Sequence, residues 1–366
     1  MRKGKNKGDS RKWFRIVHRW LGLTSGCIVF IVAITGSIFA FHDEIADLIY
    51  SYRKVPPREQ SFVSPSILLR AAVQDHEDAI FDMVVYQSED RPANVYGTLK
   101  GVPHEIYYNP YTGQELFIRN LDTDFFLIIE KIHRFLYLPE AVGKQVVGIA
   151  TIVFLFMLIS GIFLWFPRNK KHLRDYFRIR WNARWRRINF DWHRITGIYV
   201  CLLALIVALT GLSFSYEWMH EAFYSAGNLG QREANDFFSP VVSKAKPEDI
   251  ALDIAWKRTL EMLPESGMSF IFRQGETLPL LTGAYPFPLE FHHQSNFYFD
   301  QRTGALLHTQ LYDSKSNGLQ LQEMNYGLHT GQYFGLPGKI VAFFISLFIA
   351  GLPVSGFLIW WGRKNR

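Results

Sequence analysis

Residues 18–39 read HRWLGLTSGCIVFIVAITGSIF, and residues 193–214, which lie 175 positions later, read HRITGIYVCLLALIVALTGLSF. Both stretches open with His-Arg, have a Gly four residues after the His, and carry Thr-Gly near the end. Each is apolar over roughly 20 residues, the length with which a helix crosses a hydrocarbon core of about 30 Å. The sequence therefore predicts two membrane spans that share these residues.

A second pair of apolar stretches repeats with an offset of 195 positions. The shared positions are Gly143-Lys144 with Gly338-Lys339, Ser160-Gly161 with Ser355-Gly356, Trp165 with Trp360, and Arg168 with Arg363. A His and then a Pro precede each stretch, namely His133 with Pro139 and His329 with Pro337. The chain is thus predicted to duplicate one helix–domain–helix module, with a pseudo-twofold axis along the membrane normal.

The composition fits a membrane chain that also carries folded domains. Of its 366 residues, 48% are hydrophobic and 16% aromatic. The four predicted spans run approximately Trp20–Phe41, Gly143–Phe166, Ile195–Trp218 and Gly338–Trp361. The first is too long and too late for a cleaved signal peptide, so it is expected to be retained. The two cysteines, Cys27 and Cys201, both fall inside predicted spans and offer no disulfide framework.

Lys and Arg gather in three short flanks: the N-terminus, the linker between the second and third spans, and the C-terminus. Because such flanks favour the cytoplasm, both termini and the linker are predicted to lie there. The net charge of +7 is explained by topology and contact with anionic lipids, so nucleic-acid binding is not expected. The predicted segments are 1–42 (N-terminus and first span), 43–142 (first outer domain), 143–166 (second span), 167–194 (cytoplasmic linker), 195–219 (third span), 220–337 (second outer domain) and 338–366 (fourth span and C-terminus).

The two outer loops repeat as well. Residues 105–116 read EIYYNPYTGQEL, and residues 296–307 read NFYFDQRTGALL. Each is an alternating aromatic strand followed by an Asn or Asp turn that Thr-Gly closes, where glycine supplies a positive φ. Helical stretches are predicted before these hairpins, around Ser64–His76 and Pro247–Leu263. The predicted fold class is an α-helical membrane protein with four transmembrane helices and two small α+β extracytoplasmic domains.

These features together resemble a known family. The hairpins with an Asn/Asp turn closed by Thr-Gly, set between paired spans, look like PepSY domains. The spans resemble the PepSY-associated transmembrane helix family of iron-regulated bacterial membrane proteins: His-Arg-x-x-Gly opens the first and third spans, and Ser-Gly-x-x-x-Trp closes the second and fourth. The likeness covers residues from about 13 to the C-terminus. Some members are inner-membrane ferric-siderophore reductases with two haems, which implies the same localisation and activity here.

With that resemblance, the histidines at span ends become candidate axial ligands of two non-covalent b-type haems. His18 and His193 are repeat mates at the cytoplasmic ends of their spans, and His133 and His329 are mates on the other side. Two imidazoles on one iron give a six-coordinate, low-spin centre suited to electron transfer. We therefore expect one haem on His18 and His193 and another on His133 and His329.

Four further residues are candidates for haem packing or propionate binding. Gly22 and Gly197 follow the inner histidines by four residues on the same helix face, where a missing side chain gives room for a porphyrin. Arg19 and Arg194 are candidates for pairing with propionates, and equally for a role as topological anchors.

Other histidines remain alternatives. His42 and His220 stand at the outer ends of the first and third spans without aligning as mates, so they are alternate haem ligands or contacts. Whether two or three haems bind stays open at this point. His292 and His293 are adjacent in a loop, where a shared metal is not expected. Aromatic residues of the outer loops are either cleft-lining or core residues, namely Tyr107, Tyr108, Tyr111, Phe291 and Tyr298.

Two functional classes follow. The first is an enzyme, a haem-dependent ferric-siderophore reductase that passes electrons across the bilayer. Because the sequence has neither a dinucleotide-binding nor a P-loop motif, its electrons are expected from quinol or from a cytoplasmic reductase. The second is a non-enzymatic, membrane-anchored PepSY module that binds or regulates other proteins, in which the histidines are structural.

Overall fold

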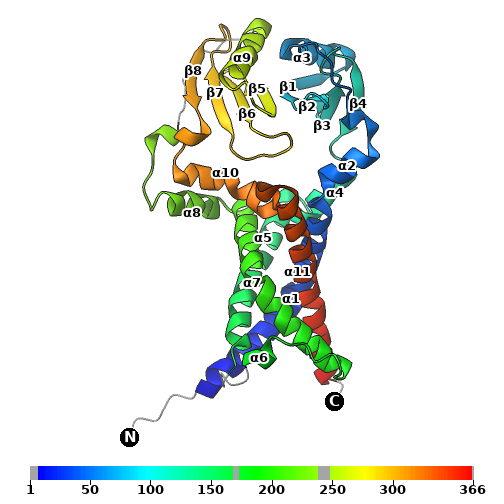
Figure 1. The fold of residues 1–366 in the computed structure, drawn as a ribbon, viewed down its shortest axis with the longest axis vertical. Helices are drawn as coiled ribbons and strands as arrows, with labels where there is room; N and C mark the ends of the chain where they lie inside the picture. Colours follow the sequence, from blue (N-terminus) through cyan, green and yellow to red (C-terminus); the bar gives the residue numbers. More distant parts are fainter. Residues whose placement is uncertain (1–6, 168–172, 238–247, 365–366) are drawn as a thin grey trace. The chain divides into compact units, whose positions relative to one another are not determined.

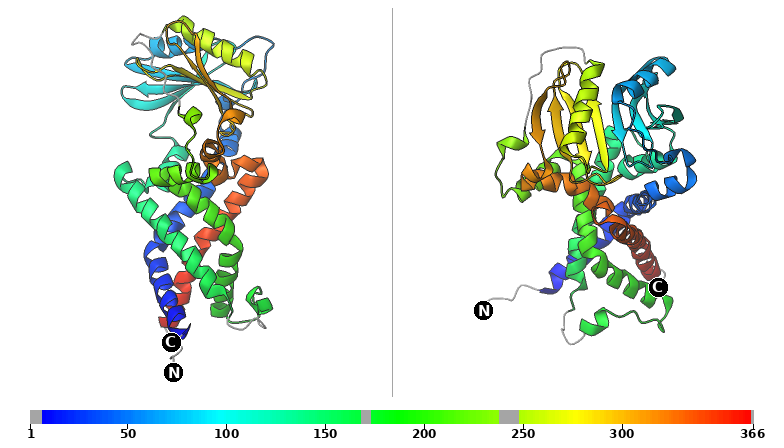
Figure 2. Two further views of the ribbon diagram at one scale, coloured as in Figure 1. Left: turned by 90° about the vertical axis from the view of Figure 1, so that its left-hand side faces the viewer. Right: turned by 45° about the horizontal axis from the view of Figure 1, so that its top comes forward.

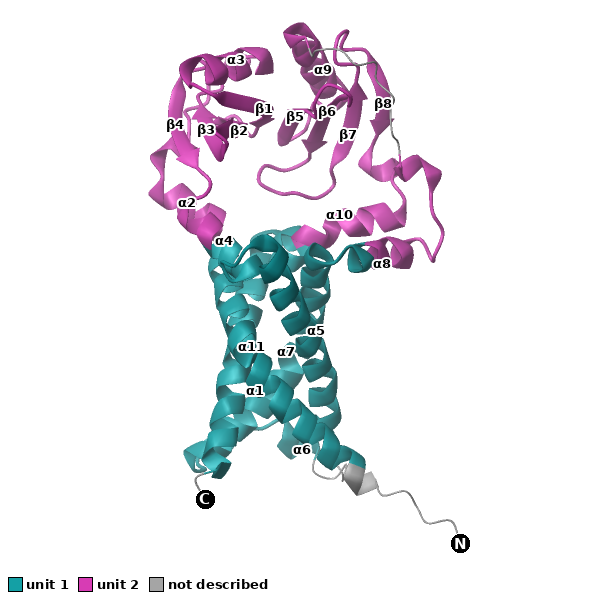
Figure 3. Ribbon diagram, turned by 180° about the vertical axis from the view of Figure 1, so that it is seen from behind, with its two compact units in different colours: residues 1–40, 129–220, 328–366 teal, residues 41–128, 221–327 magenta. Residues whose placement is uncertain are grey.

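The computed structural model describes residues 7–167, 173–237 and 248–364. The chain divides into two compact units, which Figure 3 colours separately. The membrane unit comprises Met1–Ala40, Ile129–His220 and Leu328–Arg366, and the sheet unit comprises Phe41–Ile128 and Glu221–Gly327. Arg168, a predicted repeat position, and Pro247, the predicted start of a helix, lie outside the described residues.

Four long helices form the membrane unit and run side by side in Figure 1: α1 (Lys7–Phe39), α5 (Glu140–Trp165), α7 (Trp185–Ser215) and α11 (Gly335–Lys364). All four are long and apolar enough to cross a membrane. The protein is therefore a multi-pass membrane protein. Two predicted spans run past their helices, because α1 already ends at Phe39 and α7 at Ser215.

The packing of the bundle follows the duplication. α1 contacts α5 and α11, and α7 contacts the same two helices, so the repeat mates occupy opposite corners. Small side chains such as Ala33, Ala204 and Ala350 are buried where the helices meet. Helices in lipid associate through close van der Waals contact, which small residues permit.

The sheet unit contains one antiparallel sheet of eight strands in the order β4-β3-β2-β1-β5-β6-β7-β8. The first loop supplies β1 (Ala79–Tyr86), β2 (Ala93–Leu99), β3 (Val102–Tyr108) and β4 (Glu115–Asn120). The second loop supplies β5 (Met268–Arg273), β6 (Leu280–Tyr285), β7 (Ser295–Phe299) and β8 (Leu306–Gln310). The two expected α+β domains are thus halves of one sheet, joined by pairs such as Val84 with Ile271.

One face of this sheet is covered by α3 (Pro65–Asp75) and α9 (Asp249–Met262), as Figure 2 shows. Strand alternation sends Ile106 and Tyr108 into the core beneath the helices, while Glu105 and Tyr107 point to the other face. The ring of Tyr86 from the first half stacks on that of Trp256 from the second, with 4.4 Å between centroids. The two halves therefore share one hydrophobic core.

Both predicted hairpin turns are present. The side-chain oxygen Oδ1 of Asn109 accepts hydrogen bonds from the backbone N–H groups of Tyr111 and Thr112, and Asp300 does the same in the second half. Gly113 and Gly304 have φ angles of +69° and +67°, which glycine adopts without the steric cost of a Cβ.

Shorter helices connect the spans to the sheet. They are α2 (His42–Ile49), α4 (Phe125–Phe135), α6 (Leu173–Tyr176), α8 (Glu217–Gly227) and α10 (Asn317–Thr330), with 3₁₀ turns η1 (Ser51–Arg53), η3 (Ala234–Asp236), η4 (Tyr312–Ser314) and η5 (Gln332–Phe334). The division between the two compact units falls inside α4, between Ile128 and Ile129, and inside α10, between Gly327 and Leu328. The last turns of these two helices contact the spans, through His133 on α4 and His329 on α10.

Candidate functional site

The first pair of candidate ligands, His18 and His193, is called the inner pair. It comes from α1 and α7, the two helices at opposite corners of the bundle. Nδ1 of His18 on α1 lies 2.8 Å from the hydroxyl of Ser160 on α5. Nδ1 of His193 on α7 lies 2.8 Å from the hydroxyl of Ser355 on α11. The residue after each serine is a glycine, and each imidazole lies against it: a Cβ there would be 3.6 Å and 3.5 Å from the Cε1 atoms of the two rings.

The second pair, His133 and His329, is called the outer pair. It comes from the connecting helices α4 and α10. Nδ1 of His133 on α4 lies 2.8 Å from the carbonyl oxygen of Val32 and 3.4 Å from the hydroxyl of Thr35, both on α1. Nδ1 of His329 on α10 has the equivalent partners on α7, at 3.0 Å from the carbonyl of Val207 and 3.0 Å from the hydroxyl of Thr210.

The carbonyls of Val32 and Val207 require an N–H on Nδ1 of the two outer imidazoles, because a carbonyl oxygen only accepts, and the hydroxyl contacts favour the same tautomer in the inner pair. Ser160 donates its own hydrogen to the carbonyl of Met157, and Ser355, Thr35 and Thr210 likewise donate to carbonyls of their own helices. Each hydroxyl is then an acceptor towards the histidine, so Nδ1 carries the hydrogen. The lone pair is left on Nε2, which is the state of an imidazole that binds a metal.

The outer pair has the separation of two ligands on one metal. The ring centroids of His133 and His329 lie 6.0 Å apart, with 65° between the ring planes. Two metal–nitrogen bonds of about 2 Å each, together with the half-width of each ring, place two axial imidazole centroids about 6 Å apart. The separation of these two rings therefore matches that of two imidazoles on one metal.

The inner pair borders a cavity of about 480 Å³ in the membrane unit, within the usual range for ligand pockets. The lining is largely apolar and aromatic, and includes Trp165, Tyr176 and Trp360. Five arginines also contribute to it: Arg11, Arg15, Arg19, Arg194 and Arg363. An apolar cavity with two imidazoles and a cluster of guanidinium groups suits a flat macrocycle that carries carboxylates.

Comparison with known protein families gives one match. The family described as PepSY-associated TM region matches residues 15–363, nearly the whole chain. The chain belongs to this PepSY-associated family. A comparison with curated protein sequences finds no match.

The predicted packing residues of this PepSY-associated chain differ from one another in their surroundings. Gly22 and Gly197 both line the inner cavity. A Cβ on Gly22 would lie 2.7 Å from Cε of Met157, so the missing side chain makes room for that methionine. A Cβ on Gly197 would meet only Leu352, at the ordinary contact distance of 3.9 Å.

The two candidate propionate arginines are not equivalent either. Arg194 forms an ion pair with the buried carboxylate of Asp191 at 2.9 Å and lies over the ring of Tyr176, 4.6 Å from its centroid. The repeat places Ile16 where α7 has Asp191, so Arg19 lacks that carboxylate and lies over the ring of Trp20 instead. The guanidinium of Arg19 therefore has no carboxylate at the position equivalent to Asp191 and can pair with a carboxylate of a bound group.

The alternate histidines have other partners. His42 starts α2 in the sheet unit, and its Nε2 lies 3.3 Å from a carboxylate oxygen of Asp43. His220 is on α8, and its Nδ1 lies 3.5 Å from the hydroxyl of Ser213. His292 and His293 lie beside each other in the loop before β7, with ring centroids 4.6 Å apart.

The outer aromatic residues divide by burial. Tyr107, Tyr108 and Tyr111 are buried, so they belong to the interior of the sheet unit rather than to a cleft. Tyr298 is partly buried, and Phe291 is 42% exposed. Phe291 is thus the one of the five that offers an open aromatic surface.

The sequence contained a signal for the residues that orient the histidines. Thr35-Gly36, Thr210-Gly211, Ser160-Gly161 and Ser355-Gly356 stand out as repeated pairs of a small hydroxyl residue and a glycine. In the structure each pair holds one imidazole, with the hydroxyl at Nδ1 and the glycine beside the ring. The sequence alone does not assign their role, because each histidine is distant in sequence from the pair that contacts it.

Proposed function

We propose that this protein is a di-haem b-type reductase of the bacterial inner membrane, which passes electrons across the bilayer to reduce a ferric siderophore in the periplasm. The observation that carries the proposal is the set of four imidazoles. Each presents an Nε2 lone pair, and they are grouped in two pairs with one member from each repeat.

The residues of the chain would hold each group in a defined way. His18 and His193 would hold one haem and His133 and His329 the other, and the hydroxyl at each Nδ1 would keep the ring from turning. The arginines of the inner cavity, Arg19 among them, would bind carboxylates. When bound, haem supplies one-electron chemistry in this setting.

The reaction at the outer side is a single-electron transfer. Siderophores hold Fe(III) far more tightly than Fe(II), so one electron delivered to the chelated iron releases it as Fe(II). Quinol or a cytoplasmic reductase then returns one electron to the protein. No bond within the chelator has to break.

The depth of the two pairs suits transfer across a bilayer. Seventeen positions separate His18 from Thr35, the residue of α1 that contacts His133. At 1.5 Å per residue this is roughly 26 Å along the helix, comparable with the thickness of the hydrocarbon core.

The proposed direction of transfer requires both termini and residues 167–194 in the cytoplasm, where their Lys and Arg favour them. A cytoplasmic reporter fused after Arg366 should be active in intact cells. Activity only of a periplasmic reporter at that position would reverse the topology and with it the proposed direction.

The function is tested by a reduced-minus-oxidised spectrum of the protein purified in detergent. Two bis-histidine haems should give α-bands of low-spin haem b, with two haems per chain by pyridine haemochrome analysis. His18→Ala and His193→Ala should each remove one and the same haem, and His133→Ala and His329→Ala the other. A colourless wild-type protein would sink the proposal and favour the non-enzymatic PepSY module.

A further inference from the structure

The inner site has an approximate twofold symmetry, which follows from the duplication. His18 and His193 each lie 2.8 Å from a serine hydroxyl of a neighbouring helix, and a Cβ on the glycine after each serine would be 3.6 Å and 3.5 Å from the two rings. The mates α1 and α7 occupy two opposite corners of the bundle, and α5 and α11 occupy the other two. A rotation that exchanges the repeats therefore exchanges the two imidazoles.

One pair of repeat mates in the wall of the inner cavity breaks this symmetry: Met157 on α5 and Leu352 on α11. The backbones at these two positions match, because each carbonyl accepts a hydrogen bond from the serine three residues later. The side chains differ. A Cβ on Gly22 would lie 2.7 Å from Cε of Met157, whereas a Cβ on Gly197 would lie 3.9 Å from Cδ2 of Leu352. The methionine thus fills space beside α1 that the leucine leaves open beside α7.

Both side chains lie on the side of the histidines that faces away from the first arginines of the cavity. Arg15 precedes His18 by three positions on α1, and Gly22, which Met157 covers, follows it by four. These positions are roughly 4.5 Å and 6 Å from His18 along the helix axis, in opposite directions. A macrocycle whose carboxylates pair with the guanidinium groups therefore directs its opposite edge towards Met157 and Leu352.

Haem b does not share the twofold symmetry of the site. Its two propionates are alike, but the edge opposite to them carries a vinyl group on one side of the midline and a methyl group on the other. Rotation by half a turn about this midline keeps the propionates at the arginines and exchanges the vinyl with the methyl. The two orientations are therefore equivalent in a symmetric site, and only a difference between the repeats can distinguish them.

We propose that Met157 is a positioning residue of the inner site that selects one of the two haem orientations: the methyl group of that edge faces Met157, and the vinyl group faces the open space beside Leu352. This inference rests on the proposed function, because it assigns a role towards the inner haem. The difference between Arg19 and Arg194 does not select an orientation, since the propionates that these arginines would bind are alike. A vinyl group exceeds a methyl group by one carbon, and one extra carbon in a packed site shifts an equilibrium about tenfold.

The test uses the full-length protein in a His133→Ala background, purified in detergent, in which only the inner haem should remain. Met157→Leu makes the two repeats alike at this position. The double variant with Met157→Leu and Leu352→Met moves the methionine to the other helix and keeps the composition of the site unchanged. The readout is the set of hyperfine-shifted haem-methyl resonances in the proton NMR spectrum of the ferric protein, recorded once the ratio of orientations is constant.

The His133→Ala protein should give one dominant set of resonances, with a preference of about tenfold or more. Met157→Leu should give two sets of comparable intensity, because neither orientation then places a vinyl group against a methionine. The double variant should again give one dominant set, now that of the opposite orientation. A general loosening of the site would not convert one set into the other.

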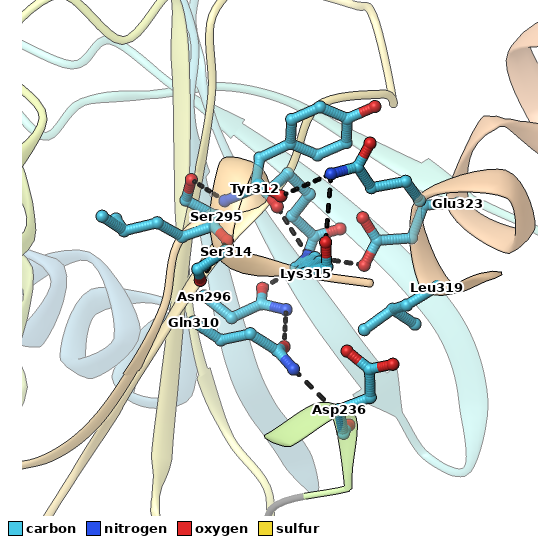
Figure 4. A network of polar contacts seen from close by, with 12 residues as sticks. Asp236, Ser295, Asn296, Gln310, Tyr312, Ser314, Lys315, Leu319 and Glu323 are labelled. Atoms are coloured by element: carbon cyan, nitrogen blue, oxygen red, sulfur yellow. Dashed lines mark hydrogen bonds and ion pairs between the residues drawn. The ribbon is translucent and has the colours of Figure 1, made fainter. Parts of the chain in front are cut away.

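The control for loss of stability is Lys315→Met in the sheet unit. This side chain is fully buried in the polar network of Figure 4, where its Nζ donates to the carbonyl of Gln294 at 2.6 Å and to the carboxylate of Glu323 at 2.5 Å. The variant should lower the thermal stability and keep the single dominant set of resonances. An effect on stability is thereby separated from the choice of orientation.

The outcomes separate the two proposals. If the wild-type protein binds no haem, the proposed function fails and the role of Met157 fails with it. If the inner haem is present, two equal sets in the His133→Ala protein, a single set in Met157→Leu, or a double variant that keeps the original orientation would overturn the role of Met157 while the reductase proposal stands. Reversal of the orientation in the double variant establishes the role.

Discussion

The imidazole of His133 lies 6.0 Å from that of His329, centroid to centroid, although the two residues are 196 positions apart. Neither belongs to a long membrane helix. Each is on a connecting helix and leans on the span of its own repeat, through the carbonyls of Val32 and Val207. Within the membrane unit, the outer site is therefore built from the spans and the last turns of α4 and α10, whereas the inner site is built from the spans alone.

The hydroxyls at Nδ1 should matter for haem affinity. Ser160→Ala removes the acceptor that orients His18, and loss of such a partner typically weakens metal binding about 10- to 100-fold. We expect the inner haem to be lost preferentially on titration with apomyoglobin, while the outer haem is retained. Thr24→Ala is the control, since this exposed threonine bonds only to carbonyls of its own helix. Equal retention in the two variants would contradict the orienting role.

The glycines beside the outer rings are expected to be sensitive to a single methyl group. A Cβ on Gly36 would lie 2.9 Å from Cε1 of His133, closer than real Cβ atoms come, so the imidazole must shift. Gly36→Ala should alter the spectrum of the outer haem and leave the inner one as it is. Ser37→Ala, one residue further on the same helix, should alter neither. A normal outer haem in Gly36→Ala would show that the ring has freedom to move.

Direction of transfer distinguishes the two haems functionally. In detergent, dithionite reaches either face, so His18→Ala should still reduce a ferric siderophore through the outer site. In intact cells the same variant should release no iron, because electrons no longer have an entry point. His329→Ala should fail in both settings. Normal siderophore reduction by His18→Ala cells would mean that electrons enter on the outer side.

The sheet unit should lose stability in acid through Asp47 on α2. Burial opposes ionisation of this carboxyl, but hydrogen bonds from Arg91 at 2.5 Å and Arg53 at 2.6 Å outweigh it and lower its pKa. A lowered pKa contributes stability above the unfolded value of about 3.9, and the contribution is lost as the pH falls through the folded pKa.

The prediction is a gap in Tm between wild-type protein and Asp47→Asn that is present at neutral pH and closes in acid, below about pH 4. Thermal unfolding of the full-length protein in detergent measures it. Glu59→Gln, which changes an exposed carboxylate of the same unit, is the control. A gap for Asp47→Asn that is independent of pH would rule out the ion pairs as its cause.

Much of the fold was predictable because the duplication repeats local patterns. The apolar periods mark the four long helices, and the Thr-Gly turns at Gly113 and Gly304 mark the hairpins where the structure has them. The ends of the spans were less predictable. Apolar residues continue past Phe39 and Ser215, so a hydropathy pattern does not show that the helices end there.

Two features had no signature in the sequence. Pairing of β1 with β5 joins strands from different loops, and edge-to-edge pairing leaves no local pattern. The duplication paired the histidines with one another, but it did not show which hydroxyl or carbonyl each would contact. His133 precedes the second span in the chain, yet its partners Val32 and Thr35 are on the first.

The symmetric order of the sheet bears on how such a chain could originate. β1 and β5 are the first strands of their halves, and the strand order outward from this pair is the same in both directions. A chain of half this length would meet a second copy of itself through one edge strand, an isologous contact of a C₂ homodimer. His133 and His329 would then be the same residue in two identical subunits. Fusion of the two copies makes assembly independent of subunit concentration and allows the halves to diverge. The facing residues Glu105 and Arg119 on β3 and β4, for example, correspond to Asn296 and Gln310 on β7 and β8.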